Sequence, residues 1–299
     1  MSSGAIRFVI LAVLAADCVG CQPRAPAPPA ARPGQVEMIV RGHQRVRERT
    51  QRRFAQASFL SPHPDSEAGI PLWMAPLLVH EYGPTQSAEP RWTRFGAVAV
   101  DAVGQAWVDC DRPTVYLLSA ELMVGSQSLK QLTYWWFYPP AASGQPLRFR
   151  GFRMTLGGRG HAVIWDVVSG EGTGRVLYLS KPVEQAATQK YGGPLPGRRF
   201  AVEPPVREHP EVVVPRIIGD GPQPLGPFVY LDAATLKPTT LICRCEPSQA
   251  DEFPHSSHYR LQRLDSPRDL YGGESPPPNL RLPPAHVSPE DVLRLPDQL

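Results

Sequence analysis

The segment QLTYWWFYPP, residues 131–140, decides the fold class. It places five aromatic residues in succession, from Tyr134 to Tyr138, directly before two prolines. Successive side chains of a strand point to opposite faces of a sheet, so a strand here carries rings on both faces. We expect Trp135 and Phe137 to lie opposite the main core. That face is either covered by a helix or the proline-rich tail, or exposed as an aromatic platform that binds a sugar, a peptide or a partner.

Signals with period two continue on both sides of this segment. The sequence predicts a hairpin around Gly104, two strands joined at 125–128, and a hairpin at 151–169 that turns at Gly-Gly-Arg-Gly. Glycine after the last helical position predicts a helix that ends at Gly192. Further strands are predicted at 77–84, 175–180, 198–204, 211–218, 227–232 and 239–245. We therefore expect a mainly β fold, with α+β as the alternative, in which antiparallel sheets are built from consecutive hairpins.

The first twenty residues have the pattern of a signal peptide. Arg7 precedes a short apolar run, which is too short to span a hydrocarbon core of about 20 residues. Small residues then lead to Cys21, as in bacterial lipoprotein signals, where the cysteine is lipidated and becomes the new N-terminus. Cys18 departs from that pattern, which prefers leucine there. The prediction is an exported protein that is lipid-anchored through Cys21, and the alternative is a secreted protein cut a few residues later.

Composition divides the remaining chain into four segments. We predict a proline- and alanine-rich tether at 21–34, a basic amphipathic helix and connector at 35–69, a β-rich globular domain at 70–251 and a proline-rich, largely extended tail at 252–299. The basic helix, expected over Gln35 to Leu60, presents either a solvated face or a contact with anionic lipid headgroups. Within the tail, Ser288 followed by proline is typical of a short helical turn.

The segment LICRCEPSQADEFPHSSHY groups residue types that bind metals. Cys243 and Cys245 share one face of a predicted strand, and His255 and His258 follow in the next loop. Three readings remain open: buried thiols, a disulfide between Cys110 and one of the pair, or a site for copper or zinc. No metal or other cofactor is expected unless this cluster is a site.

These motifs together resemble a group of uncharacterised exported bacterial proteins. The resemblance covers the aromatic strand, the segment MTLGGRGHAVIWDV and the segment GPFVYLDAATLKPTTLICRC, which ends in the two cysteines. It implies a shared fold and carries no assigned activity.

No catalytic set is recognisable, so function is limited to two hypotheses. The leading one is a non-enzymatic envelope lipoprotein with a structural or binding role, and the alternative is a metal-handling or thiol-redox protein that uses the Cys/His cluster. We expect the protein to meet a membrane through its lipid anchor and to bind an envelope protein or a glycan. Nucleic acid is not an expected partner, because the net charge is only +3 and no aromatic residues alternate with the basic ones.

Overall fold

The computed structural model describes residues 57–66, 72–81, 94–169, 175–219, 226–232, 236–244, 256–284 and 287–299. Within these residues the chain forms fourteen strands and one α-helix, so the fold is mainly β, as predicted. The strands are β1 (Ala57–Pro62), β2 (Leu77–Glu81), β3 (Ala97–Val100), β4 (Ala106–Asp109), β5 (Thr114–Val124), β6 (Gln127–Tyr138), β7 (Arg148–Leu156), β8 (Ala162–Ser169), β9 (Arg175–Ser180), β10 (Val212–Val213), β11 (Ile217–Ile218), β12 (Pro227–Leu231), β13 (Pro238–Arg244) and β14 (Ser256–Leu264). The α-helix is α2 (Lys181–Tyr191), and the 3-10 helices are η1 (Leu72–Met74), η4 (Pro267–Leu270) and η5 (Pro289–Asp291).

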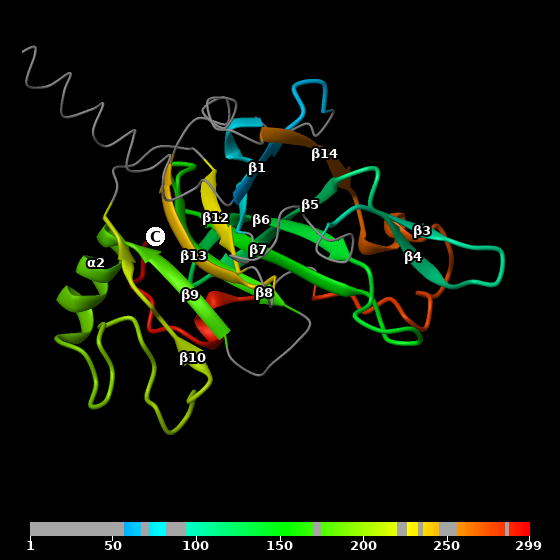
Figure 1. Ribbon diagram of the computed structural model, residues 1–299. Coiled ribbons are helices and arrows are strands. Elements are labelled where there is room, and N and C mark those ends of the chain that lie inside the picture. The colour runs from blue at the N-terminus through cyan, green and yellow to red at the C-terminus, as the bar shows by residue number, and fades with distance from the viewer. Residues whose placement is uncertain are drawn as a thin grey trace, which may run out of the picture. The chain divides into compact units, whose positions relative to one another are not determined.

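One twelve-stranded sheet organises the fold (Figure 1). Its order is β10-β9-β8-β7-β6-β5-β14-β1-β2-β12-β13, with β11 also paired to β9. Strands β5 to β9 follow one another as antiparallel neighbours, which confirms the predicted hairpins. In contrast, β14 lies parallel to both β5 and β1, and β12 lies parallel to β2. The sheet is therefore mixed, because strands distant in sequence are inserted beside the hairpins.

The aromatic strand β6 buries both of its faces, as its sequence predicts. Tyr134 and Trp136 belong to a cluster on what we call the inner face of the sheet, and Trp135 and Phe137 belong to a cluster on the outer face. All four side chains are fully buried. Gly151 of β7 is paired with Trp135, and a Cβ atom there would stand only 2.1 Å from the carbonyl oxygen of Tyr134. The close approach of these two strands thus requires glycine.

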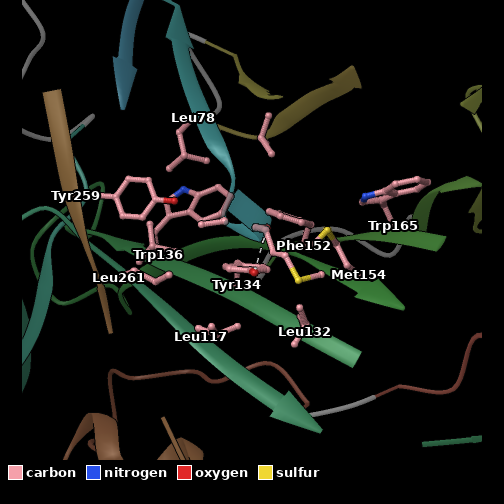
Figure 2. Close-up of a cluster of buried hydrophobic side chains, with 14 of the residues drawn as sticks. Leu78, Leu117, Leu132, Tyr134, Trp136, Phe152, Met154, Trp165, Tyr259 and Leu261 are labelled. Carbon is pink, nitrogen blue, oxygen red and sulfur yellow. Dashed lines mark hydrogen bonds between the residues drawn. The ribbon is translucent and has the colours of Figure 1, made fainter. Parts of the chain in front are cut away.

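The sheet folds over and encloses its inner face. Strand β2 is four positions from β6 in the sheet order, which is roughly 19 Å in a flat sheet with strands about 4.8 Å apart. Yet the hydroxyl of Tyr134 donates a hydrogen bond to the carbonyl of Met74, just before β2, at 3.1 Å. The hydroxyl of Tyr259 likewise donates to Pro76 at 2.7 Å. Figure 2 shows the packed side chains of this inner cluster, with Leu78 of β2 in the same group as Tyr134 and Phe152.

Two sets of elements cover the outer face. The hairpin of β3 and β4, which turns at Gly104 as predicted, packs with the chain after β14 over Trp135 and Phe137. Helix α2 and the chain from Val292 onward cover the second region. The short helical turn predicted after Ser288 is present as η5, with the Ser288 hydroxyl accepting from the backbone N–H of Glu290. The proline-rich tail therefore packs on the sheet.

The predicted domain limits of 70 and 251 leave out two strands of the sheet. Strand β1 includes the last residues of the predicted basic helix, and β14 lies in the predicted tail. Strand β14 belongs to the sheet because it has neighbours on both sides and buries Tyr259 and Leu261. The signal peptide, the tether and residues 35–56 of the basic helix lie outside the described residues.

One predicted strand, 198–204, is wrong. Side chains hold this segment as a series of turns, because Arg198 donates to the carbonyls of Pro204, Val212 and His209. The carboxylate of Glu203 also accepts from the backbone of Arg199. These side-chain contacts replace a strand ladder.

Candidate functional site

The outer face of β14 carries a polar cleft where the neighbouring strands change. Strand β1 accompanies β14 as far as Tyr259, whereas β5 begins opposite Arg260. Because side chains alternate, Tyr259 and Leu261 enter the core while His258, Arg260 and Gln262 face outward. One edge of β14 is therefore exposed beyond the end of β1, and its other edge is exposed before the start of β5. The outer side of β14 is exposed as well. We call this region the β14 cleft.

The β14 cleft has a volume of about 570 Å³. Its walls come from the loop after β1, from the segment that leads into β5, from Ala97 of the β3–β4 hairpin and from β14 itself. The residues that line it are His63, Asp65, Ser66, Ala97, Arg112, Pro113, Thr114, His258, Tyr259, Arg260, Leu261, Gln262 and Arg263. Ser66 fixes the loop to β14, because its hydroxyl accepts from the backbone N–H of Leu261 at 3.1 Å.

Two histidines meet at one end of the cleft. The ring centroids of His63 and His258 are 5.6 Å apart in an edge-to-face arrangement. Ser61 Oγ and His258 Nδ1 share a hydrogen bond of 2.9 Å, which fixes the orientation of that imidazole. The serine hydroxyl donates this bond to a bare Nδ1 and accepts it from a protonated one. The Nδ1 atom of His63 accepts from the backbone N–H of Asp65 at 3.2 Å, with the Asp65 carboxylate 3.7 Å away.

Arginines supply the positive charge of the cleft. Arg112 Nε donates to Asp109 at 2.6 Å, and Arg263 lies 3.6 Å from Asp265, so each is held by an aspartate that does not line the cleft. Among the described residues Arg260 has no ion pair, and its backbone N–H is fixed by the carbonyl of Pro113 at 2.8 Å. Arg260 is therefore the cation that remains available to a ligand.

The buried hydroxyl of Tyr116 lies within reach of this charge. Burial raises the pKa of Tyr116, while the N–H of Val98 and then the guanidinium groups of Arg112 and Arg260 oppose that rise. Val98 donates to the tyrosine hydroxyl at 2.8 Å. Both arginines therefore contribute positive charge near the Tyr116 hydroxyl. Guanidinium, imidazole and the Gln262 amide all present N–H donors, which suits a ligand that carries oxygen acceptors and negative charge.

Two members of the predicted Cys/His cluster belong to described strands. His258 lies in the β14 cleft, and the backbone of Cys243 lies on β13, four strands away in the sheet order. Cys245 and His255 lie outside the described residues. Within the described part of the chain, no three histidine, cysteine, aspartate or glutamate side chains are grouped to hold a metal ion.

The disulfide predicted as an alternative is not formed at Cys110. Its buried sulfur donates a hydrogen bond to the carbonyl of Arg94 at 3.3 Å, as a thiol does. Cys110 is instead part of the outer cluster that contains Trp135.

The alternative of an exposed aromatic platform at Trp135 and Phe137 is not what the structure shows. Both side chains are 0% exposed, because the β3–β4 hairpin and the tail residues Leu270 and Leu280 cover them. Of the two readings that the sequence left open, burial beneath the tail is the correct one.

The sequence does not identify His63 and Arg260 of the cleft, or Ser61, which orients His258. Composition places Ser61 and His63 in the predicted connector and Arg260 in the predicted extended tail. The alternation of His258, Arg260 and Gln262 with buried Tyr259 and Leu261 is a period-two signal that could have identified β14. Clustered prolines on either side obscured it.

The membrane anchor predicted at Cys21 lies outside the described residues. Among the residues that the structure describes, no helix combines the length and the hydropathy needed to cross a bilayer. No family model matches the chain, and no similar protein was found among curated proteins or solved structures. Functional inference therefore rests on the geometry of the sites.

Proposed function

We propose that the protein is an exported, lipid-anchored binding protein that holds a small oxyanion, or a molecule bearing one, in the β14 cleft. The observation that supports this most is the convergence of Arg260 with His63 and His258 on one polar cleft. Parallel pairing of β1 and β14 sets Ser61 beside His258, and the end of β1 then brings His63 to the same edge.

The side chains of the cleft favour an anion over a metal ion. Among the described residues that line it, Asp65 is the one carboxylate, and it is exposed and turned to His63. A guanidinium beside the imidazoles repels a cation and attracts phosphate, sulfate or carboxylate. A non-enzymatic role fits the absence of a recognisable catalytic set in the sequence.

Calorimetric titration of the mature protein tests this proposal. The probes are inorganic phosphate, sulfate and glucose 1-phosphate, with glucose as the uncharged comparison, at low ionic strength because salt screens exposed charges. We expect the anions to bind and glucose not to bind. Arg260→Gln should weaken binding about tenfold, since a hydrogen bond to a charged group contributes roughly 1.5–3 kcal/mol and Arg260 is exposed.

Arg268→Gln is the matched control. Arg268 is an exposed arginine in η4 that does not line the cleft. Equal losses in the Arg260 and Arg268 variants would indicate attraction to overall charge and would contradict a site. Tight binding of copper or zinc that is lost in His258→Ala would support the metal-handling hypothesis instead.

A further inference from the structure

A second cavity, of about 470 Å³, lies over the outer side of β7, β8 and β9, where the tail crosses the sheet. Phe149 and Arg153 of β7, Asp166 of β8 and Arg175 of β9 line it from the sheet side. Residues 281–284 and Val287 of the tail form the opposite wall. We call it the tail cavity. It shares no lining residue with the β14 cleft.

A buried ion triad forms the floor of the tail cavity. Arg153 Nη1 donates to Asp166 Oδ2 at 3.1 Å, and Arg175 Nη2 donates to the same oxygen at 2.9 Å. The side chain of Arg153 is 5% exposed, that of Asp166 7% and that of Arg175 19%. Arg153 Nη2 also donates to the carbonyl of Pro284 at 2.7 Å, which ties the tail to the triad.

The triad holds more positive than negative charge. Two guanidinium groups share one carboxylate, which leaves one excess positive charge in a largely buried place. Such a charge is costly in a low-dielectric interior unless an anion or water compensates it. Burial, the largest effect, lowers the pKa of Arg153. Asp166 raises that pKa, and the positive charge of Arg175 lowers it.

The other ionisable groups of the cavity do not remove this excess. Arg281 adds one positive charge and Glu211 adds one negative charge, so three guanidinium groups face two carboxylates. Glu211 is itself engaged, because its carboxylate lies 3.1 Å from His209 Nδ1. Its own backbone N–H and then His209 lower the pKa of Glu211, so it stays ionised at neutral pH. One positive charge therefore remains.

We propose that the tail cavity binds the carboxylate of a small amphipathic acid. The carboxylate pairs with Arg175, whose Nη1 has no hydrogen-bond partner within the described residues, and with the exposed Arg281. Phe149, Val168 and Leu282 supply the apolar wall for the hydrocarbon part of the ligand. A single carboxylate matches the single excess charge, and its two oxygens fit the planar fork of a guanidinium group. This proposal is independent of the oxyanion proposed for the β14 cleft.

Titration with octanoate tests the proposal, and octanol serves as the uncharged comparison of equal chain length. We expect octanoate to bind the mature protein and to raise its melting temperature with the logarithm of its concentration above the Kd, as a ligand selective for the folded state does. Octanol should bind at least tenfold more weakly. In Arg175→Gln, octanoate binding should fall about tenfold, and in Arg281→Gln it should fall several-fold.

A control variant separates the tail cavity from other effects. Arg159→Gln changes an exposed turn arginine that lines neither the tail cavity nor the β14 cleft, and it should leave octanoate binding unchanged. Because Arg281 is exposed, Arg281→Gln should fold normally. This variant therefore still tests the proposal if Arg175→Gln does not fold. Equal binding of octanol and octanoate, no octanoate binding at millimolar concentration, or unchanged affinity in Arg281→Gln would each overturn the proposal.

Discussion

The stability of the outer face of β7, β8 and β9 depends on the negative charge of Asp166. Its Oδ2 atom accepts from both Arg153 and Arg175, and it lies on β8 between the strands that carry those arginines. Removing an arginine and removing the aspartate are therefore unequal changes. Loss of Arg175 leaves one balanced pair, whereas loss of the aspartate charge leaves two buried guanidinium groups facing each other without a counterion.

We therefore expect Asp166→Asn to lower the free energy of unfolding by about 3–5 kcal/mol, the usual cost of breaking a buried ion pair. Arg175→Gln should cost less, on the order of 1–2 kcal/mol, because it loses hydrogen bonds of a partly exposed side chain but relieves the charge excess. Urea unfolding of both variants at neutral pH measures the difference. If Arg175→Gln loses more stability than Asp166→Asn, groups other than Arg153 and Arg175 must balance the charge of Asp166.

At the scale of elements, β14 determines both the sheet and the candidate site. It lies between the antiparallel strands β5–β9 and the group of β1, β2, β12 and β13. The two parts of the sheet are therefore connected through β14. The residues facing the core hold the two halves together, and those facing outward form the cleft. A strand from the end of the chain thus completes a sheet begun near residue 57.

The Leu261→Ala variant tests the structural part of this statement. Leu261 is 1% exposed, and truncation of a buried leucine costs about 2–5 kcal/mol, so we expect a loss of that size in the free energy of unfolding. Met123→Ala is the control, because Met123 is 59% exposed and should change stability by less than about 0.5 kcal/mol. In hydrogen exchange, the amides of β14 that pair with β1 or β5 should be as protected as those of β6. Rapid exchange at β14 would show an unpaired tail.

The elements that the sequence predicts are those whose pairing is local. The two-faced aromatic strand, the turn at Gly104 and the end of α2 at Gly192 follow from side-chain alternation and from backbone angles that glycine adopts readily. The positions of β1 and β14 do not follow, because their partners are about 200 residues apart in the chain and nothing in either strand specifies the other. The cleft was missed for the same reason: His63 and His258 are neighbours only through that pairing.

At the scale of the whole molecule, the proposal links an anchored N-terminus to a folded unit with two ligand sites. The described residues belong to one compact unit, in which the β14 cleft and the tail cavity occupy different parts of the outer face. The predicted tether at 21–34 supplies the spacer that an anchored binding protein requires. Location and binding are separate claims with separate tests.

Metabolic labelling with a palmitate analogue tests the location. We expect label on the protein expressed in a bacterial host and a mature chain that begins at Cys21, because a lipoprotein signal is cut directly before the modified cysteine. Cys21→Ser should abolish the label and release the protein from the membrane fraction. A labelled Cys21→Ser variant, or a mature chain that begins at another residue, is incompatible with the proposed anchor.

A phosphate titration followed by amide chemical shifts in isotope-labelled protein tests the proposed oxyanion site of the β14 cleft. We expect saturable shifts at His63, His258, Arg260 and Gln262, with the amides around Arg159 unchanged. The same titration of Arg260→Gln should require about tenfold more phosphate, in line with the loss of one charged hydrogen bond. Saturable shifts confined to residues outside the cleft, or no saturation at millimolar phosphate, would contradict the claim.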